Sequence, residues 1–408
     1  MFDVKKIRLD FPMLKKKMQN HPLVFLDNAS TTMKPRCVID AVRQYYENET
    51  SNSHRGDYDL CFHVDQTIAK TRALVAKFIH ANETEIVFTS GASMSINLVA
   101  FGYGVKYLKK GDEILLTEAE HASNVLPWYK VAELTGAVVK FIPLNRKGRL
   151  TLENVKRSVN KKTKIIAIAQ ITNVLGYLAP IEAICKYAHE HQIVVVCDGA
   201  QSVPHRFTDV KKLDVDFLSF SGHKMCGPTG IGVLYGKFDL LKKMDPLMTG
   251  GGMNSRFDMC GAVEYLAPPI KFEAGTLNIA GIYGLNAAIT YLEKIGMDNI
   301  EKYESNLRQY LVKELKKIDD IIIYNEEAES GIVTINKKTV FAQDEATFLN
   351  SKGIAVRSGQ HCAKILNNFL KTPATIRISL YFYNTKEEID QLLDALKKGD
   401  YLDAYFAW

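Results

Sequence analysis

Two apolar runs of the sequence are each followed by polar side chains whose types suggest catalysis. In "VVVCDGAQS" the run leads to Asp198 and Gln201, and in "FLSFSGHK" it leads to Ser221, His223 and Lys224. Among apolar walls a lysine can lose its proton and condense with an aldehyde, and a carboxylate can keep a pyridinium nitrogen protonated. Because ligands of open α/β sheets bind at the carboxyl ends of the strands, these residues predict a site that holds an aldehyde on a pyridine ring.

A third stretch, "EIVFTSGASMSINLVAF", predicts a phosphate site. Its pattern indicates a strand, then Gly91, Ala92 and Ser93, and then a helix. Backbone N–H groups at a helix start bind dianions, and the Ser93 hydroxyl adds a donor. Ser221 and His223 could donate from the opposite side. An aldehyde, a pyridine ring and a phosphate together predict pyridoxal 5'-phosphate (PLP) as the cofactor.

Two further residues are candidates for catalysis. His121 follows another apolar run, in "TEAEHASN", where its imidazole could lie on the cofactor ring and shuttle protons. Cys362 lies in the polar segment "VRSGQHCAK", beside His361 and near Arg357, whereas Cys197 lies inside an apolar run. Because electropositive and accessible surroundings favour the thiolate, Cys362 is predicted to be a nucleophile.

The elements that must position these residues alternate between apolar runs and helical patterns. This alternation predicts an α/β fold in which a mostly parallel sheet is covered by helices on both faces. We expect this large domain at residues 22–285. Its predicted strands are "EIVFTS", "DEILLTE", "VVKFIPL", "KIIAIAQI", "QIVVVCDGA", "VDFLSFSG" and "IGVLYG".

Residues 1–21 and 286–408 are predicted to form a smaller domain, an N-terminal helix plus a C-terminal α+β unit. The pattern "VKKIRLDFPMLKKKM" predicts one amphipathic helix that packs on the C-terminal unit. A long helix after the large domain should break near Gly296, and a capping box at Thr385 and Glu388 should start the last helix. The predicted strands are "DIIIYN", "GIVTINK", "IAVRSG" and "TIRISLYFYN".

Composition limits the partners. The formal net charge of +6 is mild and interspersed over 408 residues, which argues against nucleic acid as the main ligand. No segment reaches the roughly 18 apolar residues that span a bilayer, and "MFDVKKIRLD" lacks the apolar stretch of a secretory signal, so we expect a cytoplasmic protein. The seven cysteines form no C-x-x-C pair and predict neither a disulfide framework nor a metal site.

The same residues belong to segments that resemble a known family. The chain is similar to PLP-dependent cysteine desulfurases of the SufS type (group II), within the fold-type I aminotransferase superfamily. The matching segments occur in order and cover nearly the whole chain. They are "FLDNASTTMKP", "SINLVAFGYG", "ITNVLGYLAPI", "CDGAQSVPH", "SFSGHKMCGPTGIGVLYG", "FEAGTLN", "VRSGQHCA" and "TIRISLYFYNT".

The resemblance implies a role for each matched residue. Lys224 would form the Schiff base with PLP, while Asp198 would bind the pyridine nitrogen and Gln201 the phenolic oxygen. His121 would stack on the ring. Cys362 would take the sulfur of L-cysteine as a persulfide and leave L-alanine.

The resemblance also implies residues for the substrate and for partners. Asn173 and Arg377 would hold the substrate carboxylate, Arg377 in a bidentate grip, with Arg357 and Arg55 as further candidates. Thr276 would reach the phosphate of the partner subunit, which implies a homodimer. The sulfur would pass to a small SufE-like or SufU-like acceptor protein for iron–sulfur cluster assembly.

The chain departs from the family pattern at several positions. Ala92 stands where the phosphate loop usually has the first of two hydroxyl residues, so one donor fewer is expected there. Gln360, Asn254 and Leu277 replace the residues that are common at their positions. These departures concern cofactor affinity, acceptor choice and turnover more than the class of reaction.

Three other functions are compatible with parts of this pattern. A selenocysteine lyase would use the same site with selenium in place of sulfur. An aminotransferase or epimerase of the same fold would not need Cys362. A scaffold without activity would not need Lys224, Asp198 and His121 together.

Overall fold

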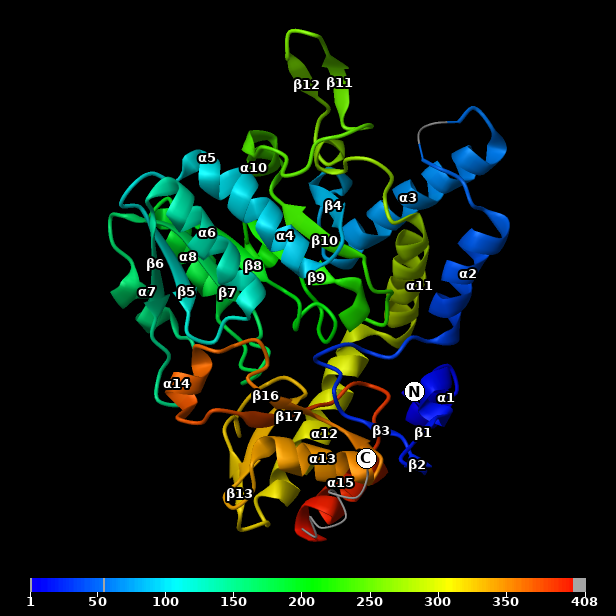
Figure 1. The fold of residues 1–408 in the computed structure, drawn as a ribbon, viewed down its shortest axis with the longest axis vertical. Coiled ribbons are helices and arrows are strands. Elements are labelled where there is room, and N and C mark those ends of the chain that lie inside the picture. The colour runs from blue at the N-terminus through cyan, green and yellow to red at the C-terminus, as the bar shows by residue number, and fades with distance from the viewer. Residues whose placement is uncertain (1, 54–55, 399–408) are drawn as a thin grey trace.

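The computed structural model describes residues 2–53 and 56–398, and its largest element is a seven-stranded sheet (Figure 1). The strands follow the order β4 (Ile86–Thr89), β10 (Gly232–Gly236), β9 (Phe217–Ser221), β8 (Val194–Asp198), β7 (Thr163–Ala169), β5 (Glu113–Thr117) and β6 (Val138–Ile142). From β9 to β6 the strands run parallel, whereas β10 is antiparallel to both of its neighbours. The α/β fold and the predicted strands of the large sheet are confirmed.

The large sheet is buried on both faces because successive side chains of its strands point to opposite sides. In β7, Ile166 and Ile168 pack into one core, and Ile165 and Ala167 pack into the other. The first face is covered by α2 (Arg36–Asn48), α3 (Asp59–Phe78), α7 (Leu152–Ser158), α8 (Ile181–Glu190), α9 (Val210–Leu213) and α11 (Ile279–Ile295). The second is covered by α4 (Ala92–Val99), α5 (Val105–Tyr107), α6 (Leu126–Thr135) and α10 (Phe238–Lys243).

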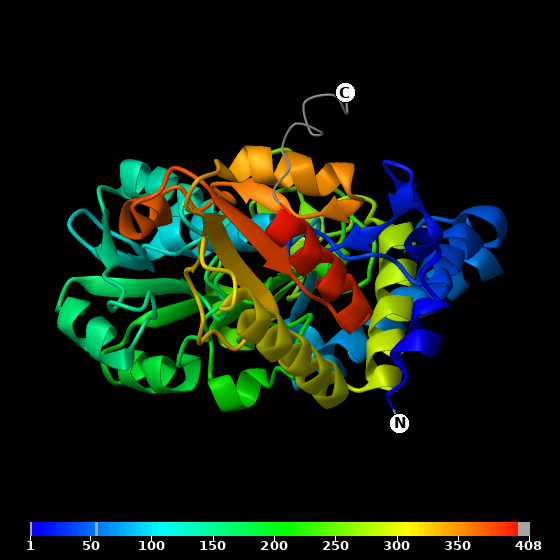
Figure 2. The same cartoon turned by 90° about the horizontal axis from the view of Figure 1, so that it is seen from below.

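A second, antiparallel sheet lies below the large one in Figure 1 and faces the viewer in Figure 2. Its strands follow the order β13 (Ile321–Ile323), β14 (Ile332–Lys337), β17 (Thr375–Ser379) and β16 (Arg357–Gly359). It packs with α12 (Met297–Leu315), α13 (Ala342–Ser351) and α15 (Lys386–Lys398). The predicted break is confirmed, since α11 ends and α12 begins around Gly296, whose φ is 90°. Thr385 and Glu388 form the predicted capping box.

The prediction of one long N-terminal helix is wrong. The chain forms α1 (Val4–Arg8), a 3₁₀ turn (Pro12–Lys15) and strand β1 (Lys17–Met18), which pairs with β2 (His21–Pro22). Pro12 has no backbone N–H and constrains the residue before it, so an α-helix cannot continue through this point. The expected contact with the C-terminal part does form, because Arg8 Nη1 lies 2.8 Å from a carboxylate oxygen of Glu388.

A pair of short strands, a short helix and a hairpin complete the fold. Strand β15 (Ile354–Ala355) pairs with β3 (Val24–Phe25), and α14 (Leu366–Leu370) follows the cysteine segment. A hairpin of β11 (Asn254–Phe257) and β12 (Val263–Tyr265) projects beyond the large sheet at the top of Figure 1. Within the described residues, no helix has the length and apolar character needed to cross a membrane. The limits 22–285, 1–21 and 286–408 for two domains stay a prediction.

Candidate active site

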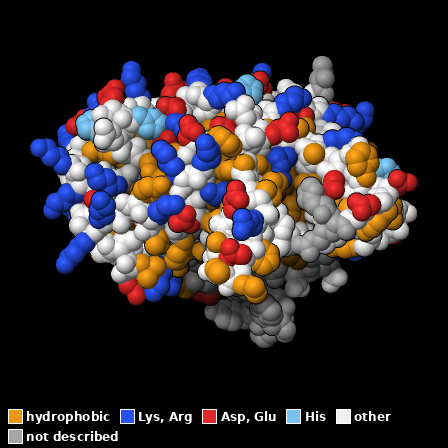
Figure 3. Space-filling model, turned by 90° about the horizontal axis from the view of Figure 1, so that it is seen from above, with side chains coloured by type: hydrophobic (Ala, Val, Ile, Leu, Met, Phe, Trp, Pro, Cys, Tyr) orange, Lys and Arg blue, Asp and Glu red, His pale blue; other side chains and the backbone are white. Residues whose placement is uncertain are grey.

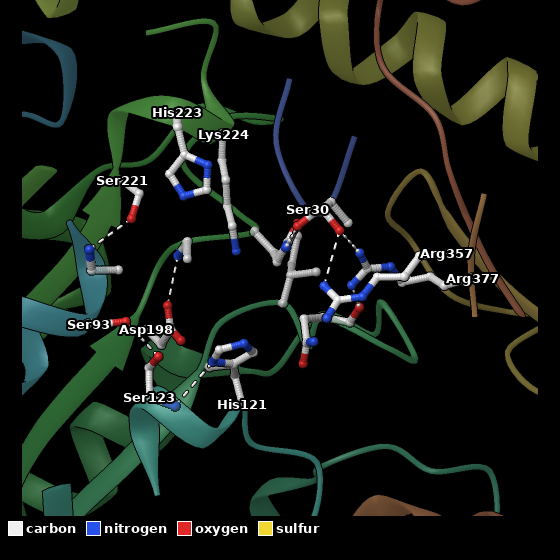
Figure 4. A pocket seen from close by; sticks show the side chains of 17 residues that line it. Ser30, Ser93, His121, Ser123, Asp198, Ser221, His223, Lys224, Arg357 and Arg377 are labelled. Atoms are coloured by element: carbon white, nitrogen blue, oxygen red, sulfur yellow. Dashed lines mark hydrogen bonds between the residues drawn. The ribbon is translucent and has the colours of Figure 1, made fainter. Parts of the chain in front are cut away.

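A cavity of about 180 Å³ lies at the carboxyl edge of the large sheet, and Arg357 and Arg377 of the small sheet line its opposite side (Figure 4). Segments far apart in the sequence meet here because the parallel strands all end at this edge. Most of the predicted site residues line it. They are Ala92, Ser93, His121, Asn173, Asp198, Gln201, Ser221, His223, Lys224, Arg357 and Arg377.

Lys224 projects into the cavity from the turn that follows β9. Burial lowers the pKa of Lys224, Asp198 opposes this effect, and the Arg377 and Arg357 guanidinium groups add to it, so that the pKa is about 8. The uncharged amine, which can act as a nucleophile or a base, is therefore easier to form at Lys224 than at an exposed lysine.

Asp198 ends β8 and is buried at the floor of the cavity, where burial raises its pKa. One of its oxygens accepts a hydrogen bond from the Ala200 N–H at 2.9 Å. Nearby, Gln201 Nε2 donates to the Ala29 carbonyl at 2.7 Å, and Gln201 Oε1 is buried with no partner among the described residues. A buried carboxylate and an unsatisfied amide indicate a polar ligand.

The start of α4 forms a cluster of hydrogen-bond donors. The Ala92 N–H donates to Ser221 Oγ at 2.8 Å, and the hydroxyls of Ser93 and Ser123 lie 2.6 Å apart. Gly91 precedes them with a φ of 153°, and a Cβ added there would lie 3.3 Å from Ser221 Oγ. Hydroxyls and N–H groups at a helix N-terminus suit a phosphate dianion.

Two histidines of the cavity are uncharged at neutral pH. Burial and, to a smaller extent, the positive charge of Lys224 lower the pKa of both His121 and His223 to about 4. His121 Nδ1 accepts a hydrogen bond from the Ser123 N–H at 3.1 Å. Because Nδ1 is an acceptor, the proton of the His121 ring is on Nε2.

Two arginines approach the cavity from strands of the small sheet. Arg377, on β17, donates to Ser30 Oγ at 2.8 Å and to Asp27 at 3.0 Å, and Arg357, on β16, donates to the same Ser30 oxygen at 3.1 Å. Arg377 also donates to the Asn173 carbonyl at 3.0 Å. Arg377 Nε and Asn173 Oδ1 are buried without a partner among the described residues. Two adjacent guanidinium groups suit a carboxylate.

Cys362 lies beside the cavity and not among its lining residues. Its side chain is exposed, and Sγ is 3.7 Å from Arg357 Nη2. Cys197 and Cys226, in contrast, are buried, and burial raises the pKa of Cys226 to about 12. Among these three thiols, Cys362 alone has a cationic neighbour within hydrogen-bonding range and access to solvent.

Two predicted residues are not placed at the cavity of this chain. Thr276 lines a different groove, together with Met94 and Met248. Arg55 lies outside the described residues. Conversely, Ser30 and Ser123 line the cavity and were not predicted, although both belong to segments that were singled out, "FLDNASTTMKP" and "TEAEHASN". Each of these serines follows an alanine and precedes a polar residue, which gives no signal of its own.

Comparisons with known proteins identify the family of the chain. The family model described as aminotransferase class-V matches residues 24–392. A probable cysteine desulfurase from Halalkalibacterium halodurans is 45% identical and covers 97% of each chain. The solved cysteine desulfurase CsdA (S-sulfonic acid) from Escherichia coli is 35% identical over 98% of each chain, with a TM-score of 0.91. A cysteine desulfurase from Thermococcus onnurineus gives 35% identity over 97% of each chain and a TM-score of 0.91.

Proposed function

Because the chain belongs to the class-V aminotransferase family, we propose that it is a PLP-dependent cysteine desulfurase of the SufS type, which converts L-cysteine into L-alanine. The sulfur passes to the Cys362 thiol as a persulfide and from there to iron–sulfur cluster assembly. The names of the relatives and of the structural neighbours support the reaction, and the geometry of the cavity supports the residue roles.

One observation carries this proposal: a cavity that holds a buried amine opens beside an exposed thiol. Arg357 belongs to both places, since it lines the cavity that contains Lys224 and also contacts Cys362 Sγ at 3.7 Å. An aminotransferase or an epimerase needs the amine but has no use for this thiol. The pair therefore favours sulfur transfer.

The cavity residues fit PLP. The buried Asp198 carboxylate requires a positive partner, which a protonated pyridine nitrogen would provide. Gln201 keeps a second amide N–H for a phenolic oxygen, and the donors at the α4 start suit the phosphate. When bound, PLP supplies an electron-accepting ring that stabilises negative charge at the substrate Cα. The residues proposed to hold it are Lys224, Asp198, Gln201, His121, Ala92, Ser93, Ser221, His223 and, across a dimer, Thr276 of the partner subunit.

Residues of this chain would orient the substrate and move its protons. Arg377, Arg357 and Asn173 would bind the carboxylate of L-cysteine, since Arg377 Nε has no partner among the described residues; Arg55 stays a further candidate. The neutral Lys224 Nζ would remove the Cα proton. His121 carries its proton on Nε2 and can donate it from there.

The sulfur transfer balances without a further reactant. The Cys362 thiolate attacks the substrate sulfur, so that an S–S bond forms while the Cβ–S bond breaks. The electron pair of the Cβ–S bond stays with the carbon, which takes up a proton and becomes the methyl group of alanine. Carbon is reduced and sulfur is oxidised to the persulfide level.

The proposed enzyme is a cytoplasmic homodimer that works with a small SufE-like or SufU-like acceptor. The β11–β12 hairpin exposes Phe257, Met259 and Val263, and the groove that contains Thr276 lies near exposed Met248. Figure 3 views this side and shows hydrophobic side chains exposed among charged ones. A second copy of the chain would cover apolar surface of this kind. The short segment between Cys362 and α14 would keep the persulfide near the cavity mouth, where an acceptor must approach it.

The test is to add L-cysteine to the purified, PLP-loaded protein and to measure alanine, sulfide and the mass of the Cys362 peptide. We expect equal amounts of alanine and transferred sulfur, with one added sulfur on Cys362. Alanine without sulfur on that peptide, or sulfur on Cys226 instead, would contradict the proposal. Sedimentation of the same sample tests the dimer.

A further inference from the structure

The backbone of the cysteine segment adopts an unfavourable conformation at two successive residues. His361 has a φ of 50° and Cys362 a φ of 58°. Residues with a Cβ avoid the left-handed region, and two such residues in succession persist only where surrounding contacts hold them. The contacts that hold this segment therefore determine where the Cys362 thiol lies.

One of these contacts is made by the side chain of His361, which is 2% exposed although its neighbour Cys362 is exposed. His361 Nε2 lies 3.1 Å from the Thr375 carbonyl oxygen and 3.0 Å from Thr375 Oγ1. A carbonyl can only accept, so Nε2 carries the proton. Nδ1 is then unprotonated and buried, without a partner among the described residues. Burial lowers the pKa of His361 to about 3, and the imidazole is neutral.

The carbonyls of the same two residues attach the segment to the large sheet. Asn173 Nδ2 donates to the His361 carbonyl at 2.7 Å, and the Ala122 N–H donates to the Cys362 carbonyl at 2.7 Å. Asn173 lines the cavity, and Ala122 follows His121, which also lines it. Thr375 begins β17, the strand that carries Arg377. Asn173, Ala122 and Thr375 thus hold His361 and Cys362 in place. These three residues belong to separate segments that also supply residues of the proposed substrate site.

The His361 side chain does not line the cavity, and its Nε2 proton is already engaged by Thr375. It is therefore placed to act through its neighbour and not on the substrate. We propose that His361 is the positioning residue of the sulfur-transfer step: its buried, neutral imidazole fixes the segment so that Cys362 Sγ lies beside Arg357 at the cavity mouth. This inference rests on the proposed desulfurase function.

The test compares His361→Ala with His361→Gln in the PLP-loaded enzyme. Glutamine can place an amide N–H near the position of Nε2, whereas alanine cannot. We expect His361→Ala to slow persulfide formation on Cys362 about 100-fold in a single turnover, because a displacement of about 1 Å at a reacting atom costs that much. His361→Gln should recover at least about a tenth of the original rate. The change in cofactor absorbance on titration with L-cysteine should keep its midpoint in both variants.

Two controls separate positioning from general damage. His191→Ala removes an exposed histidine at the end of α8 that does not line the cavity, and persulfide formation should stay close to that of the unaltered enzyme. The cofactor content and thermal midpoint of each variant are measured alongside. If His361→Ala is not obtained in folded form, His361→Leu fills the same volume without an N–H and takes its place.

The outcomes distinguish this inference from the function on which it rests. If the unaltered enzyme forms no alanine and no persulfide, the proposed function fails. If it does form them, a His361→Ala enzyme as fast as the unaltered one overturns the positioning role. A loss of substrate binding and cofactor content in parallel with the rate, in both the alanine and the glutamine variant, overturns it as well.

Discussion

The edge of the large sheet and the cysteine segment of the small sheet hold their reactive groups in opposite ways. At the sheet edge, Asp198 ends one buried strand and Lys224 lies in the turn after the next, and burial shifts the pKa of each. In the cysteine segment, Cys362 is exposed in a short loop whose backbone is held by Asn173 and Ala122. Charge development at a carbon atom needs groups removed from water, whereas a sulfur that must leave the enzyme needs a thiol that another protein can reach.

The cysteine thiols of the two regions differ in burial in the same way. Burial raises the pKa of Cys197 well above its ordinary value and that of Cys226 to about 12, so neither is a thiolate at neutral pH. Cys226 is only two residues from Lys224 in the chain. Proximity to the cavity therefore does not make these two thiols reactive, and the proposed role of Cys362 rests on its exposure and its contact with Arg357.

The largest expected effect concerns the sheet edge. Lys224→Ala should lower alanine formation from L-cysteine by at least about 1,000-fold, because it removes both the amine that bonds the cofactor and the base for the Cα proton. Amino-acid analysis after a timed reaction measures the rate, and the absorbance spectrum reports the bound cofactor. Alanine formation at the original rate would remove Lys224 from the mechanism.

Lys34 provides the matched control. Burial lowers the pKa of Lys34 to about 8 as well, but its ammonium donates to the backbone carbonyls of Thr32 and His223 and does not line the cavity. Lys34→Ala should therefore keep more than about a tenth of the activity. Equal losses of activity in Lys224→Ala and Lys34→Ala would mean that the position of Lys224 at the end of a strand does not explain its role.

The next effect concerns the cysteine segment. Cys362→Ser should abolish sulfur transfer and lower steady-state alanine formation at least about 100-fold, since serine cannot form an S–S bond. The spectral change on binding L-cysteine should persist, because the sheet edge is intact. Cys260→Ser alters another exposed thiol, which lies on the β11–β12 hairpin. This variant should change neither the rate of alanine formation nor the spectral change on binding L-cysteine. Full activity of Cys362→Ser would favour an aminotransferase or epimerase reaction.

The sequence predicts the sheet edge better than the cysteine segment for a physical reason. Runs such as "VVVCD" and "FLSFS" are strands buried on both faces, so the residue that ends each run is fixed by local pattern alone. The shared contact of Arg357 and Arg377 with Ser30 joins three distant segments and leaves no local pattern. The prediction of one N-terminal helix is wrong because the helical periodicity of the sequence continues past Pro12, whereas the helix does not.

A smaller effect is the dependence of stability on pH in the two regions. The pKa of His121 is lowered to about 4 and that of His361 to about 3, both chiefly by burial, whereas a histidine in the unfolded chain titrates near 6.5. Between pH 6.5 and pH 4.5 the unfolded chain binds protons that the folded protein does not. The contribution of each such histidine to the free energy of unfolding should therefore decrease as the pH is lowered, by up to about 1.4 kcal/mol per pH unit, and stay constant above pH 7. Glu120, whose pKa burial raises to about 7, opposes this change over the same range.

Thermal midpoints at pH 7 and pH 5 measure this dependence. His361→Gln should reduce the loss between the two values, because glutamine takes up no proton in either state. His191→Gln, which changes an exposed histidine next to α8, should leave the loss as it is. If the thermal midpoint falls by the same amount in the unaltered protein, in His361→Gln and in His191→Gln, the cysteine segment does not contribute to the pH dependence of stability.

The smallest expected effect returns to the sheet edge, at the start of α4. Ala92 lines the cavity, and its N–H is already bound to Ser221 Oγ, so a hydroxyl at this position would add one donor to the phosphate site without replacing another. Ala92→Ser should tighten PLP binding about threefold, which is a modest gain because a net hydrogen bond contributes about 1 kcal/mol or less in such a setting. Titration of the cofactor-free protein with PLP measures the affinity. The rate of persulfide formation on Cys362 at saturating PLP should not change, since the added hydroxyl belongs to the anchoring of the cofactor and not to the thiol segment. Weaker binding of PLP, or a change in the persulfide rate with no change in affinity, would show that the two regions are coupled more closely than their separate contacts suggest.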